Sequence, residues 1–505
     1  MAPKIKASAM HQTEVAIAQA EAPELERVNW RQDPGLRKLY FFAAIICVAS
    51  ATTGYDGSML NNIRILPQWT DYFNDPQGSN LGILTALYSI GSIASLPIVP
   101  FVSDHFGRRW AIISGCFIMI IAAAIQGASQ NLAMFKGGRF LMAPRKSHSN
   151  LQLSLESGSN HQYLALVWNQ RIPTDWSWRI PTIVQGAPSV IQIIFIWWIP
   201  ESPRWLISKD RQDEALAVLA KYHANGNAQH PTVQFEYAEI KETLRLEFIA
   251  KKSSSYLDFI KTKGNRYRFV LVVSLGLFSQ WSGNGLVSYY SADIYKSIGI
   301  TSSDSQLGLN GGLNIWSLIV SCTCALLCDR VGRRPLFIAA TLGMLCCFIA
   351  WTICAAVYQD NGNKAAGRAV VAFIWLHGTT YSLAWSGLLV GYTVEIMPFK
   401  IRAKGLMVMN FWVQVALVIN QYVNPLGFKH LQPNWKLYTI YTCWIALELV
   451  FVYFLYVETR GPTLEEIAKI FDGEEAEVAQ VDIDKARLAS AVEKNDTTVE
   501  HRNVV

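Results

Sequence analysis

Charged side chains are scarce in this sequence. Only 16% of its 505 residues are Asp, Glu, Lys or Arg, whereas a soluble protein carries about 25%. This scarcity argues against an ordinary soluble globular fold. A short apolar leader is also lacking, because the first 38 residues are polar and the first apolar run is long enough to stay in a bilayer. We therefore expect no cleaved secretory signal.

Metal ligands and catalytic pairs are lacking as well. Cys322, Cys324 and Cys328 lie close together, but no histidine or acid accompanies them inside their apolar run. Small packing residues explain this cluster better than a metal site does. His377 stands alone in its run, which favours a packing or pore residue over a catalyst. The apolar runs hold no Ser/His or metal-binding pair, so we expect neither an intramembrane enzyme nor a cofactor.

Long apolar runs are what the sequence does have. Ten of them are each about long enough to cross a bilayer, for which about 17–25 residues suffice. They cover residues 39–53, 81–102, 110–128, 180–199, 269–290, 307–328, 336–358, 369–394, 406–423 and 437–457. An eleventh run, 128–143, is short and contains Lys136 and Arg139. Because the runs are solid and do not alternate, we predict an all-α polytopic membrane protein and not a β-barrel.

Positive charges distinguish the segments between these runs. Lys and Arg concentrate before the first run, in short loops and in a central segment, whereas residues 61–80 hold few. The positive-inside rule then places both ends of the chain in the cytoplasm. Because the Lys and Arg residues concentrate beside the membrane spans, their positive charge does not indicate nucleic-acid binding. The predicted divisions are an N-terminal arm (1–38), a first half (39–200, irregular at 144–171), a helical linker (201–268), a second half (269–457) and a tail (458–505).

One polar motif occurs twice, each time between two apolar runs. Asp-x-x-Gly-Arg-Arg stands at 104–109 and at 329–334, and a Glu with an Arg nearby follows each half. The glycines permit a tight turn, and the acids can bind a helix N-terminus or an arginine. The alternative is a loop that is merely basic. Two copies at matching positions instead favour two parallel halves, with charged pairs at the cytoplasmic side that form a gate between the halves. The predicted gate residues are Asp104, Gly107, Arg108, Arg109, Glu201, Arg204, Asp329, Gly332, Arg333, Arg334, Glu458 and Arg460.

These motifs, with several others, are similar to those of a known family. The chain resembles the sugar porters of the major facilitator superfamily, most closely the fungal lactose-permease and cellodextrin-transporter-like branch. The likeness covers roughly residues 32–472, apart from one gap. The further segments that carry it are TGYDGSMLN at 53–61, GGRF at 137–140, PESPRWL at 200–206, FSQWSGNGLVSYY at 278–290, VEIMPFKIRAKG at 394–405 and ETRGPTLEE at 458–466.

The resemblance implies a fold and a function. The fold would have two pseudo-repeated halves with nominally twelve spans, about ten of them complete here and the fourth short. Its function would be symport of a disaccharide or hexose with a proton by alternating access, performed by a monomer in the lipid bilayer of the plasma membrane. Glu395 and Arg402 would join the inner gate. The linker stretches 210–222 and 235–249 would be bracing helices, with a solvated linker as the alternative.

The resemblance also assigns a proton-coupling pair. Asp56 lies toward the end of the first span, where an ionisable group is a functional candidate. From position alone it could equally be a helix-end residue that meets lipid headgroups. The resemblance implies that Asp56 is the proton-coupling carboxylate and that Arg139, in the short fourth span, is its partner. Protonation of Asp56 would weaken that pairing and so couple closure to proton uptake.

The candidate sugar ligands lie mainly in the second half. Sugar hydroxyls need amides, which both donate and accept, and sugar rings need aromatic faces. Gln280 and Asn284 are four residues apart and should share a helix face, and the family's sugar-binding Gln falls on Gln280. A role in helix packing is an equal alternative for four of the candidates, namely Asn314, Trp385, Asn410 and Gln414. Trp385 could instead face lipid. The predicted ligands are Gln280, Trp281, Asn284, Tyr289, Tyr290, Asn314, Trp385, Asn410 and Gln414.

The repeat shows that the first half is short. Asp104 and Glu201 are 97 positions apart, but Asp329 and Glu458 are 129 apart, a difference of about 32 residues. The segment 144–171 is rich in Ser, Asn and Gln and has no run able to cross a bilayer. We therefore expect that the chain as written does not transport sugar. The cause would be either an exon that is missing from the sequence or a protein that is a degenerate relative of the family. A non-transporting sugar sensor is the rival function, although sensors tend to carry a long tail.

Overall fold

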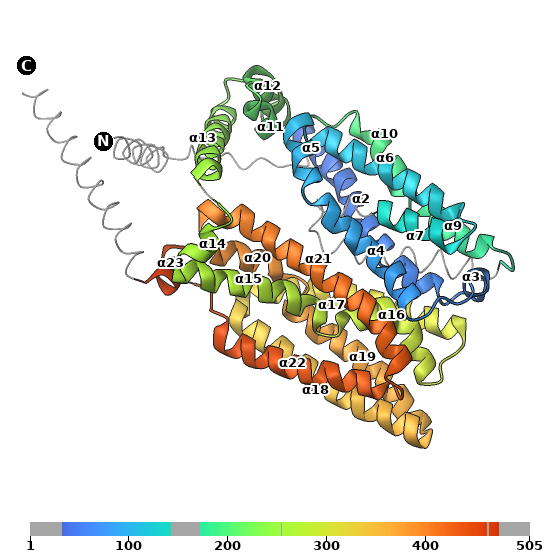
Figure 1. The fold of residues 1–505 in the computed structure, drawn as a ribbon. Helices are drawn as coiled ribbons and strands as arrows, with labels where there is room; N and C mark the ends of the chain where they lie inside the picture. Colours follow the sequence, from blue (N-terminus) through green and yellow to red (C-terminus); the bar gives the residue numbers. More distant parts are fainter. Residues whose placement is uncertain (1–32, 143–171, 254, 462–463, 474–505) are drawn as a thin grey trace, which may run out of the picture.

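The computed structural model describes residues 33–142, 172–253, 255–461 and 464–473, and these are almost entirely helical (Figure 1). The first half comprises α2 (Pro34–Ile63), α3 (Pro67–Tyr72), α4 (Ser79–Ser95), α5 (Ile98–Phe106), α6 (Arg108–Gly127), α7 (Leu132–Leu141), α9 (Trp176–Val184) and α10 (Ala187–Ile196). The second half comprises α15 (Lys263–Trp281), α16 (Asn284–Ser297), α17 (Ser303–Val331), α18 (Arg333–Asn361), α19 (Lys364–Ala384), α20 (Leu388–Ile396), α21 (Phe399–His430) and α22 (Trp435–Leu455).

Helices lie at all ten of the long apolar runs. Seven helices in the described residues are long and apolar enough to cross a membrane, or eight if the bent pair α4 and α5 counts as one span. That pair bends by 44° at Leu96 and Pro97, because proline cannot continue the backbone hydrogen bonding of a helix. The eleventh run forms only the ten residues of α7. The irregular segment 144–171 lies outside the described residues.

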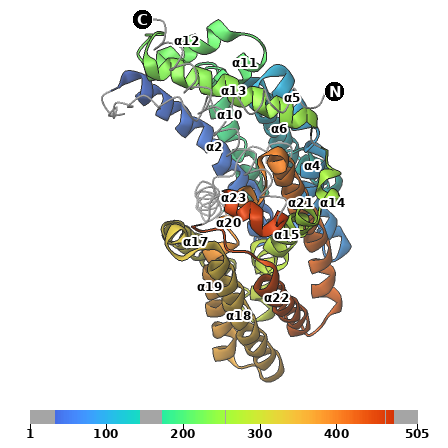
Figure 2. The same ribbon diagram turned by 90° about the vertical axis from the view of Figure 1, so that its left-hand side faces the viewer.

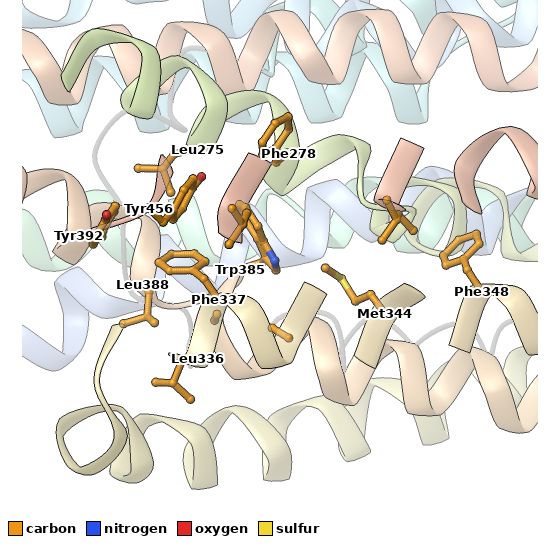
Figure 3. Packing of buried hydrophobic residues seen from close by; sticks show 14 of the residues in the cluster. Leu275, Phe278, Leu336, Phe337, Met344, Phe348, Trp385, Leu388, Tyr392 and Tyr456 are labelled. Atoms are coloured by element: carbon orange, nitrogen blue, oxygen red, sulfur yellow. The ribbon is translucent and has the colours of Figure 1, made fainter. Parts of the chain in front are cut away.

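The second half has a large hydrophobic core of its own. Phe337 and Tyr456 pack edge-on against the ring of Trp385, and Figure 3 shows these side chains pointing toward one another. Trp385 is 1% exposed, and its indole nitrogen donates to Thr341 Oγ1 over 3.1 Å. The prediction that Trp385 faces a sugar or lipid therefore differs from the structure. Trp385 lies in the core, because its apolar aromatic neighbours there cover most of its surface.

The linker forms a helical unit at one end of the molecule (Figures 1 and 2). It comprises α11 (Pro203–Ser208), α12 (Gln212–His223) and α13 (Pro231–Ser253), whereas the last linker helix, α14 (Asp258–Lys261), packs on α15 of the second half. The two predicted linker helices are confirmed as α12 and α13. Because α12 packs on α2 and α13 touches α21, the linker contacts both halves. Within α14, the Lys261 ammonium lies 2.6 Å from the Asp258 carboxylate and lowers the pKa of that carboxyl to about 2.

A short final helix, α23 (Leu464–Asp472), packs against α15. The Asp472 carboxylate receives two hydrogen bonds from the buried guanidinium of Arg268, at 2.7 and 2.8 Å. Such a bidentate pair fixes orientation as well as charge. The start of the predicted tail is thereby attached to the second half, whereas residues 1–32 and 474–505 lie outside the described residues.

Candidate substrate site and gates

The span that carries the main sugar candidates is broken. One helix, α15, ends at Trp281, and the next, α16, begins at Asn284. Gly283 between them has φ of +89°, a left-handed conformation that glycine adopts without steric cost. The expectation that Gln280 and Asn284 share one helix face was therefore wrong, because it assumed an uninterrupted helix. The two amides instead lie on either side of the break.

Side chains from neighbouring helices satisfy the carbonyl groups at this break. A helix end leaves carbonyl groups without intrahelical partners, and buried ones need replacements. Three residues of α19 and α21 supply them. Tyr381 Oη donates to Ser279 O at 2.9 Å, Asn420 Nδ2 donates to Gln280 O at 2.7 Å, and His377 Nε2 lies 3.0 Å from Ser282 O. His377 is thus a residue that fixes the break, and Tyr381 and Asn420 are contributors that the sequence analysis missed.

The predicted ligands beside the break are half-buried. Gln280, Trp281, Asn284 and Tyr289 all have partial exposure. The Trp281 indole nitrogen donates to Ala416 O at 3.0 Å, and its ring lies 5.2 Å from that of Trp444. The indole is therefore held rigid while part of its surface remains accessible. A fixed aromatic surface between two amides has the chemistry that a sugar ring requires.

The remaining predicted ligands are distributed more widely. Gln414 on α21 is 7% exposed, and its Oε1 has no hydrogen-bond partner in the described structure. Asn314 on α17 and Asn410 on α21 are half-buried. Tyr290 is fully buried, and its hydroxyl donates to Gln421 O at 2.6 Å and lies 2.9 Å from Thr85 Oγ1 of the first half. The structure thus places Tyr290 in the contact between the halves and leaves Gln414 with an unused acceptor.

The proton-coupling candidates are described only in part. Asp56 lies on α2, but its side chain is outside the described residues. Arg139 on α7 is 2% exposed, and its guanidinium lies 5.7 Å from the centre of the Tyr88 ring. It also interacts electrostatically with Tyr289 of the second half. Arg139 therefore connects the short fourth span to the region of the break.

The two halves are joined by polar contacts at the end of the bundle far from the repeated motifs. Here α2 meets α16, and α4 runs beside α21 (Figure 1). The Arg64 guanidinium donates to both carboxylate oxygens of Asp293, at 2.9 and 3.1 Å. Asn61 Nδ2 donates to Ser291 Oγ over 2.8 Å. We call these contacts, Arg64 with Asp293 and Asn61 with Ser291, the seal. The sequence analysis missed them, although an arginine shortly after an apolar span is a signal that could have found them.

The repeated motifs form the same structure at the other end of each half. In the first half, backbone amides of Arg108 and Arg109 donate to the Glu201 carboxylate at 3.0 and 3.2 Å. In the second half, those of Arg333 and Arg334 donate to the Glu458 carboxylate at 3.0 and 3.1 Å. Each carboxylate therefore caps the N-terminus of the helix that follows the motif, α6 or α18, where negative charge is favoured.

In the second half, a charge pair adjoins this cap. Arg333 Nη2 and Nε lie 3.0 and 3.2 Å from Glu395 Oε1, and Thr459 Oγ1 donates to Glu395 Oε2 over 2.5 Å. In this conformation each of the glutamates Glu201, Glu395 and Glu458 bonds to groups of its own half. Gate pairs that hold the two halves together in an outward-facing state stay a prediction.

The other predicted gate residues lie around these caps. Asp104 accepts a bond from Trp205 Nε1 through its carbonyl oxygen, and the Arg460 amide donates to Glu458. Arg402 Nε donates to Met397 O over 3.3 Å. Arg204 is half-buried on α11, and the Asp329 side chain lies outside the described residues.

Two buried polar side chains were missed by the sequence analysis. Gln185, between α9 and α10, is fully buried, and neither amide atom has a partner in the described structure. Glu448 on α22 is also fully buried. A glutamate inside an apolar run of 21 residues is a functional candidate by default, and that signal could have identified Glu448.

Comparison with known proteins decides the family. The sequence profile described as "Sugar (and other) transporter" matches residues 42–143 and 152–471. The chain belongs to this family. It is 28% identical over 489 residues to the MFS-type transporter oryC of Aspergillus oryzae, with 88% of each chain covered. It is 27% identical over 479 residues to the high-affinity glucose transporter 1 of Candida albicans, with 87% of each covered.

The fold of this sugar transporter family member is also found among solved structures. The xylose transporter XylE of E. coli in its inward-open conformation superimposes with a TM-score of 0.71 at 19% identity. The alignment covers 86% of this chain and all of XylE. The predicted all-α fold of the major facilitator superfamily is thereby confirmed, and the chain is an integral membrane protein. The lactose-permease and cellodextrin-transporter branch stays a prediction.

Proposed function

We propose that this fold carries a hexose or a disaccharide across the plasma membrane together with a proton, by alternating access. The broken α15–α16 span is the observation that carries the proposal. It presents the amides of Gln280 and Asn284 and the face of Trp281, groups that suit hydroxyls and the apolar face of a sugar ring. Membrane carriers commonly place their sites at such discontinuous helices. The names of the glucose and xylose transporters among its relatives support a sugar as the substrate.

Alternating access would use the two ends of the bundle differently. The seal of Arg64 with Asp293 and of Asn61 with Ser291 closes the end far from the motifs. At the motif end, the carboxylate caps bond within their own halves. This arrangement fits a state open toward the predicted cytoplasmic side, where both chain ends would lie. Rocking of the halves would break the seal and expose the site to the other side.

Proton coupling would act through Asp56 and Arg139. The proximity of Arg139 to Tyr289 supports this part of the proposal, because a change in Asp56 charge would reach the second half through one guanidinium. Protonation would weaken the attraction between Asp56 and Arg139 and leave Arg139 free to shift toward Tyr289.

Calorimetry on the detergent-purified chain tests the site. Gln280→Ala removes one amide from a polyhydroxyl site, so we expect affinity for D-glucose or lactose to fall by about 1–3 kcal/mol, or roughly tenfold to a hundredfold. Gln229→Ala, an exposed amide of the linker, serves as the matched control and should leave affinity unchanged. Equal affinity of the Gln280→Ala protein and the parent for every sugar that binds would contradict the proposed site.

Sugar binding without transport is the second candidate, as in a sensor or a degenerate carrier. It is favoured by the ten residues of α7, which span only about 15 Å at 1.5 Å per residue, half of a bilayer core. Calorimetry and uptake together separate the two candidates. Saturable binding with no uptake would favour this one, whereas saturable uptake would favour the carrier.

A further inference from the structure

Glu448 is a carboxyl group buried within the second half. It lies on α22 (Trp435–Leu455), away from both helix ends, and is 0% exposed. Its Oε1 accepts a hydrogen bond of 2.6 Å from the Trp444 indole nitrogen, one helical turn away. Its Oε2 has no hydrogen-bond partner in the described structure. One carboxyl oxygen is thus held in place, and the other is left unused.

Cations are absent from the surroundings of Glu448 in the described part of the chain. The helices packed against α22 are chiefly α18 and α15. On α15 the charged side chains are Lys263, Arg266 and Arg268, all in its first two turns, and on α18 they are Arg333, Arg334 and Asp360, all near its ends.

The remaining titratable groups near Glu448 are weak acids. Tyr381, Tyr441 and Tyr456 interact electrostatically with it. None of these groups carries a positive charge. An ionised Glu448 would therefore lie buried without a counter-charge, a far costlier state than a neutral carboxyl.

Glu448 faces the helix that carries the candidate sugar site. Residues 444, 448 and 451 repeat at spacings of four and three and so share one face of α22. Trp444 contacts Trp281 with ring centres 5.2 Å apart, and Phe451 contacts Phe278 with ring centres 5.1 Å apart. Glu448 lies between these two contacts. A change in its charge would thus act directly on the end of α15 at the break.

We propose that Glu448 is a second proton-binding site, located in the second half and distinct from the Asp56 and Arg139 pair. Its carboxylate takes a proton from water and is neutral in the conformation described here. The proton on Oε2 has no internal acceptor, so it returns to water when the packing of Trp281 and Trp444 opens. This inference does not depend on the proposed sugar function, because protonation can be measured without sugar.

Infrared spectroscopy of the full chain in a detergent without ester groups tests the proposal. Among the groups of the protein, only protonated carboxyls absorb in the high-frequency carbonyl region, and exposed acids are ionised at neutral pH. We expect Glu448→Gln to remove one such band at neutral pH. Trp444→Phe should retain the band but shift its frequency, because the indole donor is lost. Glu236→Gln, which removes a carboxyl of the linker, is the matched control and should leave the band unchanged.

The exchange of the proton is measured on the same samples. We expect the band of the parent chain to shift in heavy water and to lose intensity as the pH is raised, because a base removes the proton from the carboxyl group. A band unaffected by Glu448→Gln would overturn the proposal, because Glu448 would then be ionised. A band that is lost in Glu448→Gln but neither exchanges nor titrates in the parent would also overturn it, since the acid would be structural. Neither outcome bears on whether the chain binds D-glucose.

Discussion

The two halves carry the same turn but different charge networks. Glu201 and Glu458 cap α6 and α18 with hydrogen bonds that agree within 0.1 Å, at 3.0 and 3.2 Å in one half and 3.0 and 3.1 Å in the other. Gly107 and Gly332 also agree, with φ of +100° and +103°. In the second half, the Arg333 guanidinium also pairs with Glu395 near the end of α20. The turn is therefore a local structure that persists without that pair.

The difference follows from what the first half lacks. Arg108 occupies the place of Arg333, but its side chain is exposed and has no ion pair within the described residues. The partner in the second half, Glu395, ends α20 and precedes α21. Among residues 33–142 and 172–200, no helix corresponds to α20 or α21. Within the described residues, the first half therefore keeps the helix cap without a partner that corresponds to Glu395.

Restoring a complete fourth and fifth span to the first half should change sugar uptake more than any other substitution. We expect the 505-residue chain to show no saturable sugar uptake in a transporter-null host, and a chain with a complete fourth and fifth span to show it. Sequencing the transcript identifies the segment to restore, and radiolabelled D-glucose uptake is the measurement. Robust uptake by the chain as written would contradict the inference that the first half is incomplete.

Replacing Asp56 tests whether the first half carries the proton coupling. In the restored chain, Asp56→Asn should abolish uphill accumulation driven by a pH gradient but leave exchange of sugar down its gradient, because an amide cannot titrate. Proteoliposomes with an imposed gradient provide the measurement. Asp71→Asn, an exposed acid on α3, is the control. Normal accumulation by Asp56→Asn would remove this residue from the mechanism.

The glycine pair tests whether the two turns are equivalent. A Cβ at Gly107 would lie 2.6 Å from Glu201 Oε2, and one at Gly332 would lie 2.9 Å from Glu458 Oε2. With a positive φ in addition, Gly107→Ala and Gly332→Ala should each destabilise by about 1–3 kcal/mol. Thermal unfolding in detergent measures this. Gly115→Ala, inside α6 where a Cβ meets nothing within 4 Å, should stabilise by about 0.5–1 kcal/mol because alanine favours a helix. Unequal effects of the first two substitutions would show that the turns differ.

The smallest expected effect distinguishes the two motif arginines. Arg333→Ala removes a partly buried pair with Glu395, so we expect a loss of about 1 kcal/mol. Arg108→Ala removes an exposed side chain, and its effect should be within about 0.5 kcal/mol. The same unfolding assay in low salt measures both. Equal losses would mean that the charge pair of the second half adds nothing beyond the shared cap.

The sequence by itself determined the membrane class, the positions of the spans and the repeat. These depend on the length of apolar runs and on motif spacing, which one chain displays directly. It also showed the shortness of the first half, because Asp104 to Glu201 could be compared with Asp329 to Glu458. The candidate ligand Gln280 could be named from its motif, but its surroundings could not.

Tertiary structure decided what each polar group contacts. The break at Gly283 separates Gln280 from Asn284, and side chains over ninety positions away satisfy its carbonyls. Trp385 lies in the core because Phe337 and Tyr456 surround it. Contacts between residues far apart in sequence depend on how helices pack, and apolar periodicity does not encode which neighbour a buried polar atom meets.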